Sequence, residues 1–231
     1  MYRIQDIIDM DKHLLLSMTG GESLFTDGCI GVFAMPAVWI PMLITLLYVL
    51  VKNNNVKDFL TIVGFVTSML AVTFLLSEYA LQPLFEYLRT VYGADSLHLL
   101  DAMNEFRAGN GFLLTHATIA FAVATFFSLL IRHGILTFSL LLWAAIGCYA
   151  GLYMAVNYPW DILAGALIGV LCAFLTYRLY KYMLNKQRRS RRDWISDRFT
   201  KSGYEVPDVY RLLLVMYATF AAIPVISFFL I

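Results

Sequence analysis

Residues 157–169 read NYPWDILAGALIG and combine a helix start with the beginning of a membrane span. Pro159 suits the first turn of a helix because it has no N–H group to leave unpaired, and the Asp161 carboxylate can cap the free amides there. Gly165 and Gly169 follow at a spacing that allows a second helix to approach closely. The stretch predicts a transmembrane helix that begins at Asp161, directly after Pro159, and packs tightly against another helix.

The composition of the whole chain places it in a lipid bilayer. Of its 231 residues, 60% are hydrophobic and 14% are charged, and the mean hydropathy is +0.71. A helix needs about 20 mostly apolar residues to cross the hydrocarbon core. We therefore predict an all-α polytopic membrane bundle of six transmembrane helices, preceded by an interfacial amphipathic helix, with spans near residues 29–51, 59–77, 112–131, 135–156, 162–180 and 212–231.

The distribution of Lys and Arg predicts the orientation of this bundle. Most of them fall in the segments 52–58, 132–134 and 178–211, which six spans would place on one side of the membrane. The positive-inside bias makes that side cytoplasmic. The loop 78–111 and the turn 157–161 would then face outward, which is the periplasm if the membrane is a bacterial inner membrane. The basic run NKQRRSRRDW is interpreted as a topology signal, and no nucleic-acid partner is predicted.

Polar chemistry is therefore expected in the outward loops. His116 stands near the start of an apolar span, where an ionisable side chain is a functional candidate or a structural hydrogen-bonding group. His98, Asp101 and Glu105 could share one helix face, and their pattern favours a solvated surface over a metal site. The three cysteines form no metal-binding or redox pair, so neither a metal nor a cofactor is predicted.

These residues resemble the membrane-bound type-2 phosphatidic acid phosphatase family, whose catalytic core is shared with vanadium haloperoxidases. The similarity covers about residues 29–183 and is closest in YPWDILAGALIG. The family's first motif is a Lys followed, after six residues, by Arg-Pro, and only its Arg is kept, as Arg89, with Gln82 in the Lys position. Its second motif, Pro-Ser-Gly-His, falls on residues 113–116, where only His116 is kept.

The third family motif joins Ser-Arg, a His and an Asp. It falls on Ala150, Gly151, Asn157 and Asp161, so only the Asp is kept. The resemblance implies that the missing His would attack phosphorus, that Asp161 would orient it, that His116 would protonate the leaving group and that Arg89 would bind phosphate. Asn157 cannot be that nucleophile, because the lone pair of an amide nitrogen is delocalised into its carbonyl.

The resemblance also implies a domain organisation. We predict an interfacial segment at 1–28, a phosphatidic acid phosphatase-like membrane core at 29–183, a basic cytoplasmic linker at 184–211 and an additional transmembrane helix at 212–231.

The leading hypothesis is a pseudo-phosphatase and not an enzyme. It would bind a lipid phosphate or isoprenoid phosphate, or a membrane protein partner, with Arg89, His116, Gln82 and Asn157 as ligand-binding residues. One alternative is an active lipid-phosphate or isoprenyl-diphosphate phosphatase with a rearranged site. Another is an accessory structural subunit of a membrane complex.

Overall fold

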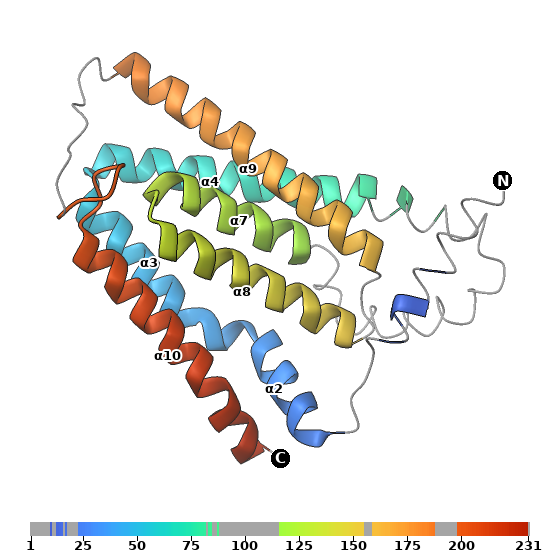
Figure 1. The fold of residues 1–231 in the computed structure, drawn as a ribbon. Helices are drawn as coiled ribbons and strands as arrows, with labels where there is room; N and C mark the ends of the chain where they lie inside the picture. The colour runs from blue at the N-terminus through green and yellow to red at the C-terminus, as the bar shows by residue number, and fades with distance from the viewer. Residues whose placement is uncertain are drawn as a thin grey trace.

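The structure is a computed structural model that describes residues 10, 13–15, 17, 23–81, 83, 84, 87, 116–154, 159–187 and 198–230. Within these residues it is a bundle of helices without a strand, as predicted (Figure 1). The helices, in chain order, are α2 (Leu24–Ala34), α3 (Ile40–Asn53), α4 (Val56–Leu76), α7 (His116–Ile131), α8 (Gly134–Tyr153), α9 (Pro159–Gln187) and α10 (Val206–Leu230). A 3-10 helix η1 (Pro36–Trp39) links α2 to α3, and a π-helix η2 (Ser77–Leu81) extends α4.

Five of the described helical segments are long and apolar enough to cross a membrane: Pro36–Asn53, Val56–Leu81, Gly134–Tyr153, Pro159–Leu184 and Val206–Phe229. The predicted count of six spans is therefore not confirmed. The span predicted at 112–131 corresponds to α7, which has 16 described residues. At 1.5 Å per residue this length is roughly 24 Å, short of the roughly 30 Å hydrocarbon core.

The first predicted span, 29–51, is wrong as a single helix. The chain breaks at Met35, which is extended (φ −71°, ψ 121°), and continues through η1 into α3. A proline disfavours helical backbone in the residue before it, and Pro36 has no N–H group to continue the ladder of α2. The indole Nε1 of Trp39 donates to the carbonyl of Phe33 (2.9 Å), which fixes the bend.

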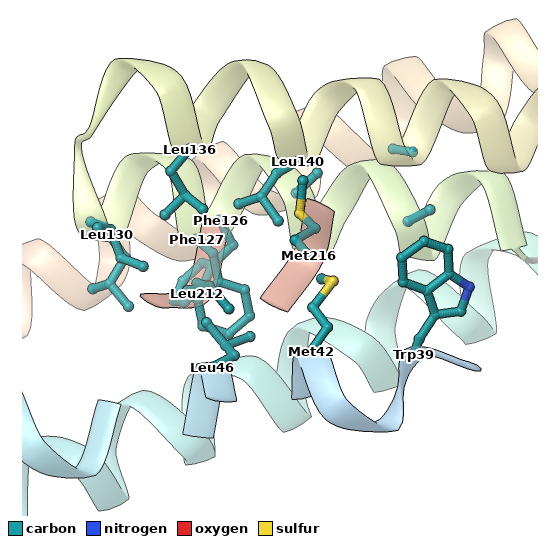
Figure 2. Packing of buried hydrophobic residues seen from close by; sticks show 14 of the residues in the cluster. Trp39, Met42, Leu46, Phe126, Phe127, Leu130, Leu136, Leu140, Leu212 and Met216 are labelled. Atoms are coloured by element: carbon teal, nitrogen blue, oxygen red, sulfur yellow. The ribbon is translucent and has the colours of Figure 1, made fainter. Parts of the chain in front are cut away.

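The core of the bundle lies where α3, α7, α8 and α10 meet. Figure 2 shows side chains from these four helices and from η1 in one apolar cluster, and the contributing residues are buried. The labelled members are Trp39, Met42, Leu46, Phe126, Phe127, Leu130, Leu136, Leu140, Leu212 and Met216. Around it, α7 packs mainly on α9 and α8, while α10 packs on α2 and α3.

One end of the bundle is held by an ionic cluster between α3 and α10. Lys52 Nζ contacts Asp208 Oδ1 (2.9 Å) and Glu205 Oε2 (3.0 Å), and Arg211 contacts Asp208 Oδ1 (2.9 Å). The Asp208 side chain has no exposed surface. Asn53 also donates to Asp208 Oδ2 (3.1 Å). Because this buried carboxylate accepts hydrogen bonds from two side chains of α3, it attaches the start of α10 to α3.

The same end gathers parts of the three basic segments. Ser202 donates to the carbonyl of Ile131 at the end of α7 (2.6 Å), close in sequence to the 132–134 turn, and Lys52 reaches the start of α10. The described parts of these segments therefore lie at one end of the bundle, and their side of the membrane stays a prediction. The helix α9 is longer than predicted and ends at Gln187, so its 29 residues extend roughly 43 Å, beyond the hydrocarbon core.

Candidate functional site

The opposite end of the bundle brings together the starts of α7 and α9 and the end of α8. His116 is the first described residue of α7 and is half-buried. Its imidazole lies beside Gly147 of α8: a Cβ atom at Gly147 would be 3.9 Å from His116 Nε2 and 3.6 Å from Phe33 Cε1. A Cβ atom at Gly147 would therefore make ordinary van der Waals contacts with both rings, which places the His116 imidazole and the Phe33 ring beside the same face of α8.

The second sequence-predicted residue, Asp161, lies in the first turn of α9, which begins at Pro159. The predicted helix start is thus confirmed to within two residues. Asp161 is half-buried, so it is not a fully solvated cap. His116 thus lies at the described start of α7 and Asp161 in the first turn of α9, and these two helices pack most extensively against each other in the described bundle.

The close packing of α7 and α9 explains this placement. At Gly165 a Cβ atom would lie 2.8 Å from Thr118 Oγ1, and at Gly169 it would overlap the Thr118 carbonyl oxygen and lie 3.1 Å from the Ala122 amide nitrogen. Only glycine allows the two backbones to come this close. The tight partner predicted from the sequence of residues 157–169 is therefore α7.

A small apolar cluster lies directly behind these first turns. It consists of Ala117 next to His116, Ile162 next to Asp161, and Cys148 of α8, all three buried. Because three helices contribute one residue each, their ends are held at one level. The cysteine packs as a small apolar side chain, as predicted.

The positions that correspond to the family's Ser-Arg pair are filled by the buried residues Ala150 and Gly151 in the last turn of α8. Ala150 has 4% of its surface exposed. The family's Arg falls on Gly151, so the cationic phosphate ligand expected at this position is replaced by a buried residue without a side chain.

The remaining predicted site residues lie outside the described residues. They are Gln82, Arg89 and Asn157, together with the surface candidates His98, Asp101 and Glu105. Within the described part of the chain, no group of three His, Cys, Asp or Glu side chains is arranged to hold a metal ion.

One pair of site residues was missed by the sequence reasoning. Ser77, at the junction of α4 and η2, donates to Thr118 Oγ1 (2.9 Å), and both side chains are buried. A hydroxyl residue two positions after His116 was the available signal. It could not be interpreted because the partner is 41 residues away in the chain.

The family model of the PAP2 superfamily matches residues 61–185, which include α7, α8, the described part of the site and most of α4 and α9. The chain belongs to the PAP2 superfamily. This confirms the family resemblance, while the flanking helices α2, α3 and α10 lie outside the matched range. No solved structure matches the chain.

Two curated relatives are similar over most of their length. A lipid A 4'-phosphatase of Bacteroides thetaiotaomicron is 34% identical over 178 residues, which cover 75% of this chain and 78% of the relative. A lipid A 4'-phosphatase of Porphyromonas gingivalis is 25% identical over 177 residues, covering 76% and 75% of the two chains.

These relatives correct the prediction that the chain is not an enzyme. Both carry the name of an enzymatic activity, and the similarity spans three quarters of the chain, including the helices that carry His116 and Asp161. The prediction rested on one substituted nucleophile. That substitution closes one route to phosphate release, and it does not exclude a reaction in which water attacks phosphorus directly.

Proposed function

We propose that this chain is a phosphatase for a phosphorylated membrane lipid, and that its substrate is a glycolipid phosphate monoester of the lipid A class. The observation that carries the proposal is the placement of His116 and Asp161 in the first turns of α7 and α9, at one end of the most closely packed helix pair. The names of the two relatives support the substrate class.

The reaction we propose does not pass through a phosphorylated enzyme. Water attacks phosphorus while the bond from phosphorus to the sugar oxygen breaks, and the His116 imidazolium donates its proton to the departing oxygen. The water proton moves to a non-bridging phosphate oxygen, and solvent reprotonates His116. The products are inorganic phosphate and the dephosphorylated lipid.

The neutral residues in the motif positions fit this route. The Asn157 side-chain oxygen can accept a hydrogen bond from the attacking water, although its nitrogen cannot form a bond to phosphorus. Asp161 would orient that amide, and the Arg89 guanidinium would bind two phosphate oxygens at once. Gln82, in place of the family's Lys, would donate an uncharged hydrogen bond to the same phosphate.

The proposed membrane location follows from charge. The described parts of the basic segments and the ionic cluster at Lys52 and Asp208 lie at the end of the bundle away from His116. With the positive-inside bias, His116 would face the periplasmic surface of a bacterial inner membrane. A lipid in that leaflet could present its phosphate at the start of α7 without leaving the bilayer.

The test is phosphate release by homogeneous protein in detergent micelles that contain a lipid A phosphate monoester, with an isoprenyl diphosphate as comparison substrate. His116→Ala should lower kcat by about a hundredfold or more, the usual contribution of a general acid. The matched control is His133→Ala: His133 caps α8 at the opposite end of the bundle, where its Nδ1 accepts from Leu136 N (3.4 Å), and its loss should leave kcat unchanged.

A second variant tests the route. Asn157→His restores the family's nucleophile, and denaturation at alkaline pH during turnover, which preserves the acid-labile bond of a phosphohistidine, should then trap a phosphorylated protein that the natural chain does not form. Lipid binding without phosphate release by the natural chain would overturn the proposed activity. Release of phosphate that is unaffected by His116→Ala would overturn the proposed site.

A further inference from the structure

A π-helical segment marks the exit of the chain from α4 toward the site. The α-helix ends at Leu76 and η2 continues as a π-helix over Ser77–Leu81, directly before Gln82 in the chain. Single π-turns inside longer helices are uncommon and often occur at functional sites.

The first residue of this segment is fixed to α7. Ser77 Oγ donates to Thr118 Oγ1 at 2.9 Å, and the two side chains are 2% and 1% exposed. Because both hydroxyls are buried from solvent, their hydrogen bond is expected to resist sliding of α4 along α7. Thr118 lies two residues after His116, within the same first turn of α7.

The same hydroxyl is also in contact with α9. A Cβ atom at Gly165 would lie 2.8 Å from Thr118 Oγ1 and 3.6 Å from the Thr118 amide nitrogen. Gly165 follows Asp161 by one turn on α9. One threonine side chain therefore touches three elements: the π-segment that leads to Gln82 and Arg89, the first turn that carries His116, and the helix that begins at Asp161.

We propose that Ser77 and Thr118 are positioning residues, whose hydrogen bond sets the axial level of the π-segment against the first turns of α7 and α9. The inference rests on the proposed function, since it concerns the geometry of that same site. A shift of about 1 Å between groups that act on one substrate can cost roughly a hundredfold in rate. A side-chain pair that prevents such a shift affects kcat without touching the substrate.

The activity test compares two replacements of one residue. Thr118→Val keeps the shape but removes the hydroxyl, and Thr118→Ser keeps the hydroxyl. The Val variant should fold, because the Ser77 hydroxyl can turn to a backbone carbonyl of the preceding turn, as Thr73 already does toward Met69 (2.9 Å). We expect kcat to fall about tenfold or more in Thr118→Val with little change in KM, and to remain within about twofold in Thr118→Ser.

A second measurement does not depend on turnover. Spin labels at Tyr79→Cys in η2 and Leu163→Cys in α9, at sites 76% and 59% exposed, report the distance between the two elements. The background has its three native cysteines replaced by alanine. The distance distribution should broaden in Thr118→Val and should match the parent protein in Thr118→Ser.

The outcomes separate the two proposals. If the natural chain releases no phosphate but the distance distribution broadens in Thr118→Val and not in Thr118→Ser, the proposed activity is overturned and the positioning inference stands. An unchanged distance together with an unchanged kcat in Thr118→Val overturns the inference, even if that variant melts at a lower temperature. Equal losses in the Val and Ser variants also overturn it, because the hydroxyl would then not be the cause.

Discussion

The close approach of α7 and α9 leads to a quantitative prediction for Gly169→Ala. The new methyl group would overlap the Thr118 carbonyl oxygen and lie 3.1 Å from the Ala122 nitrogen and 3.2 Å from the Thr118 carbonyl carbon. All three are backbone atoms, which cannot rotate away as a side chain does. The two helices must therefore separate, and overpacking of this kind costs about 1–3 kcal/mol.

A matched control isolates the steric cost. Gly64 lies in the middle of α4, and a Cβ atom there would have no heavy atom within 4 Å. Both substitutions replace glycine by alanine in a helix, and each gains about 0.8–1 kcal/mol of helix propensity. Because this gain cancels in the comparison, Gly169→Ala should be less stable than Gly64→Ala by the overpacking cost alone, about 1–3 kcal/mol.

The assay is reversible unfolding in mixed micelles, with the denaturing detergent increased stepwise and helix content followed by circular dichroism. The free energy of unfolding is compared among the natural chain, Gly64→Ala and Gly169→Ala. If the two variants agree within about 0.5 kcal/mol, the usual precision of such comparisons, the backbones of α7 and α9 do not approach as described. The packing argument for the positions of His116 and Asp161 would then fail as well.

The remaining predictions concern the opposite end of the bundle and its core. Asp208→Ala should destabilise the protein by about 3 kcal/mol, because it removes the fully buried member of the ionic cluster. Glu205→Ala should change the stability by about 1 kcal/mol or less, because the Glu205 side chain is 34% exposed. Unfolding of the two variants in detergent checks this order. Tyr217→Phe should cost about 1 kcal/mol in the same assay, since it removes a 2.6 Å hydrogen bond with buried Ser139, and a neutral result would mean that this bond is not formed. Arg132→Gly should raise the melting temperature, because Arg132 has a φ of 55° between α7 and α8, where glycine is about 1 kcal/mol less strained; an unchanged or lower value would contradict that backbone conformation.

The local sequence around residues 157–169 was sufficient for several features of the site. The start of α9, the position of Asp161 in its first turn and the presence of a tightly packed partner all follow from Pro, Asp and Gly at fixed spacings. These are short-range effects: a missing N–H group, a capping carboxylate and a missing side chain act within one or two turns of the residue that causes them. The family likewise follows from short motifs, even weakened ones.

Two predictions failed because they treated local evidence as complete. Hydropathy averaged over a window does not register a single interruption, so it predicts one helix at residues 29–51 although Pro36 divides them. Similarly, one substituted nucleophile does not predict the absence of an enzyme, since the relatives that match three quarters of the chain are named as phosphatases.

The sequence by itself determined the membrane class, the family and the helix start that carries Asp161. Only the tertiary structure decided which helix the Gly165 and Gly169 face meets, that Ala150 and Gly151 are buried, and that Ser77 bonds to Thr118. The physical reason is the distance along the chain over which each effect acts. Hydrophobicity, caps and breaks act on neighbouring residues, whereas the partner of a buried hydroxyl or of a glycine face is chosen by the packing of segments that are far apart in the chain.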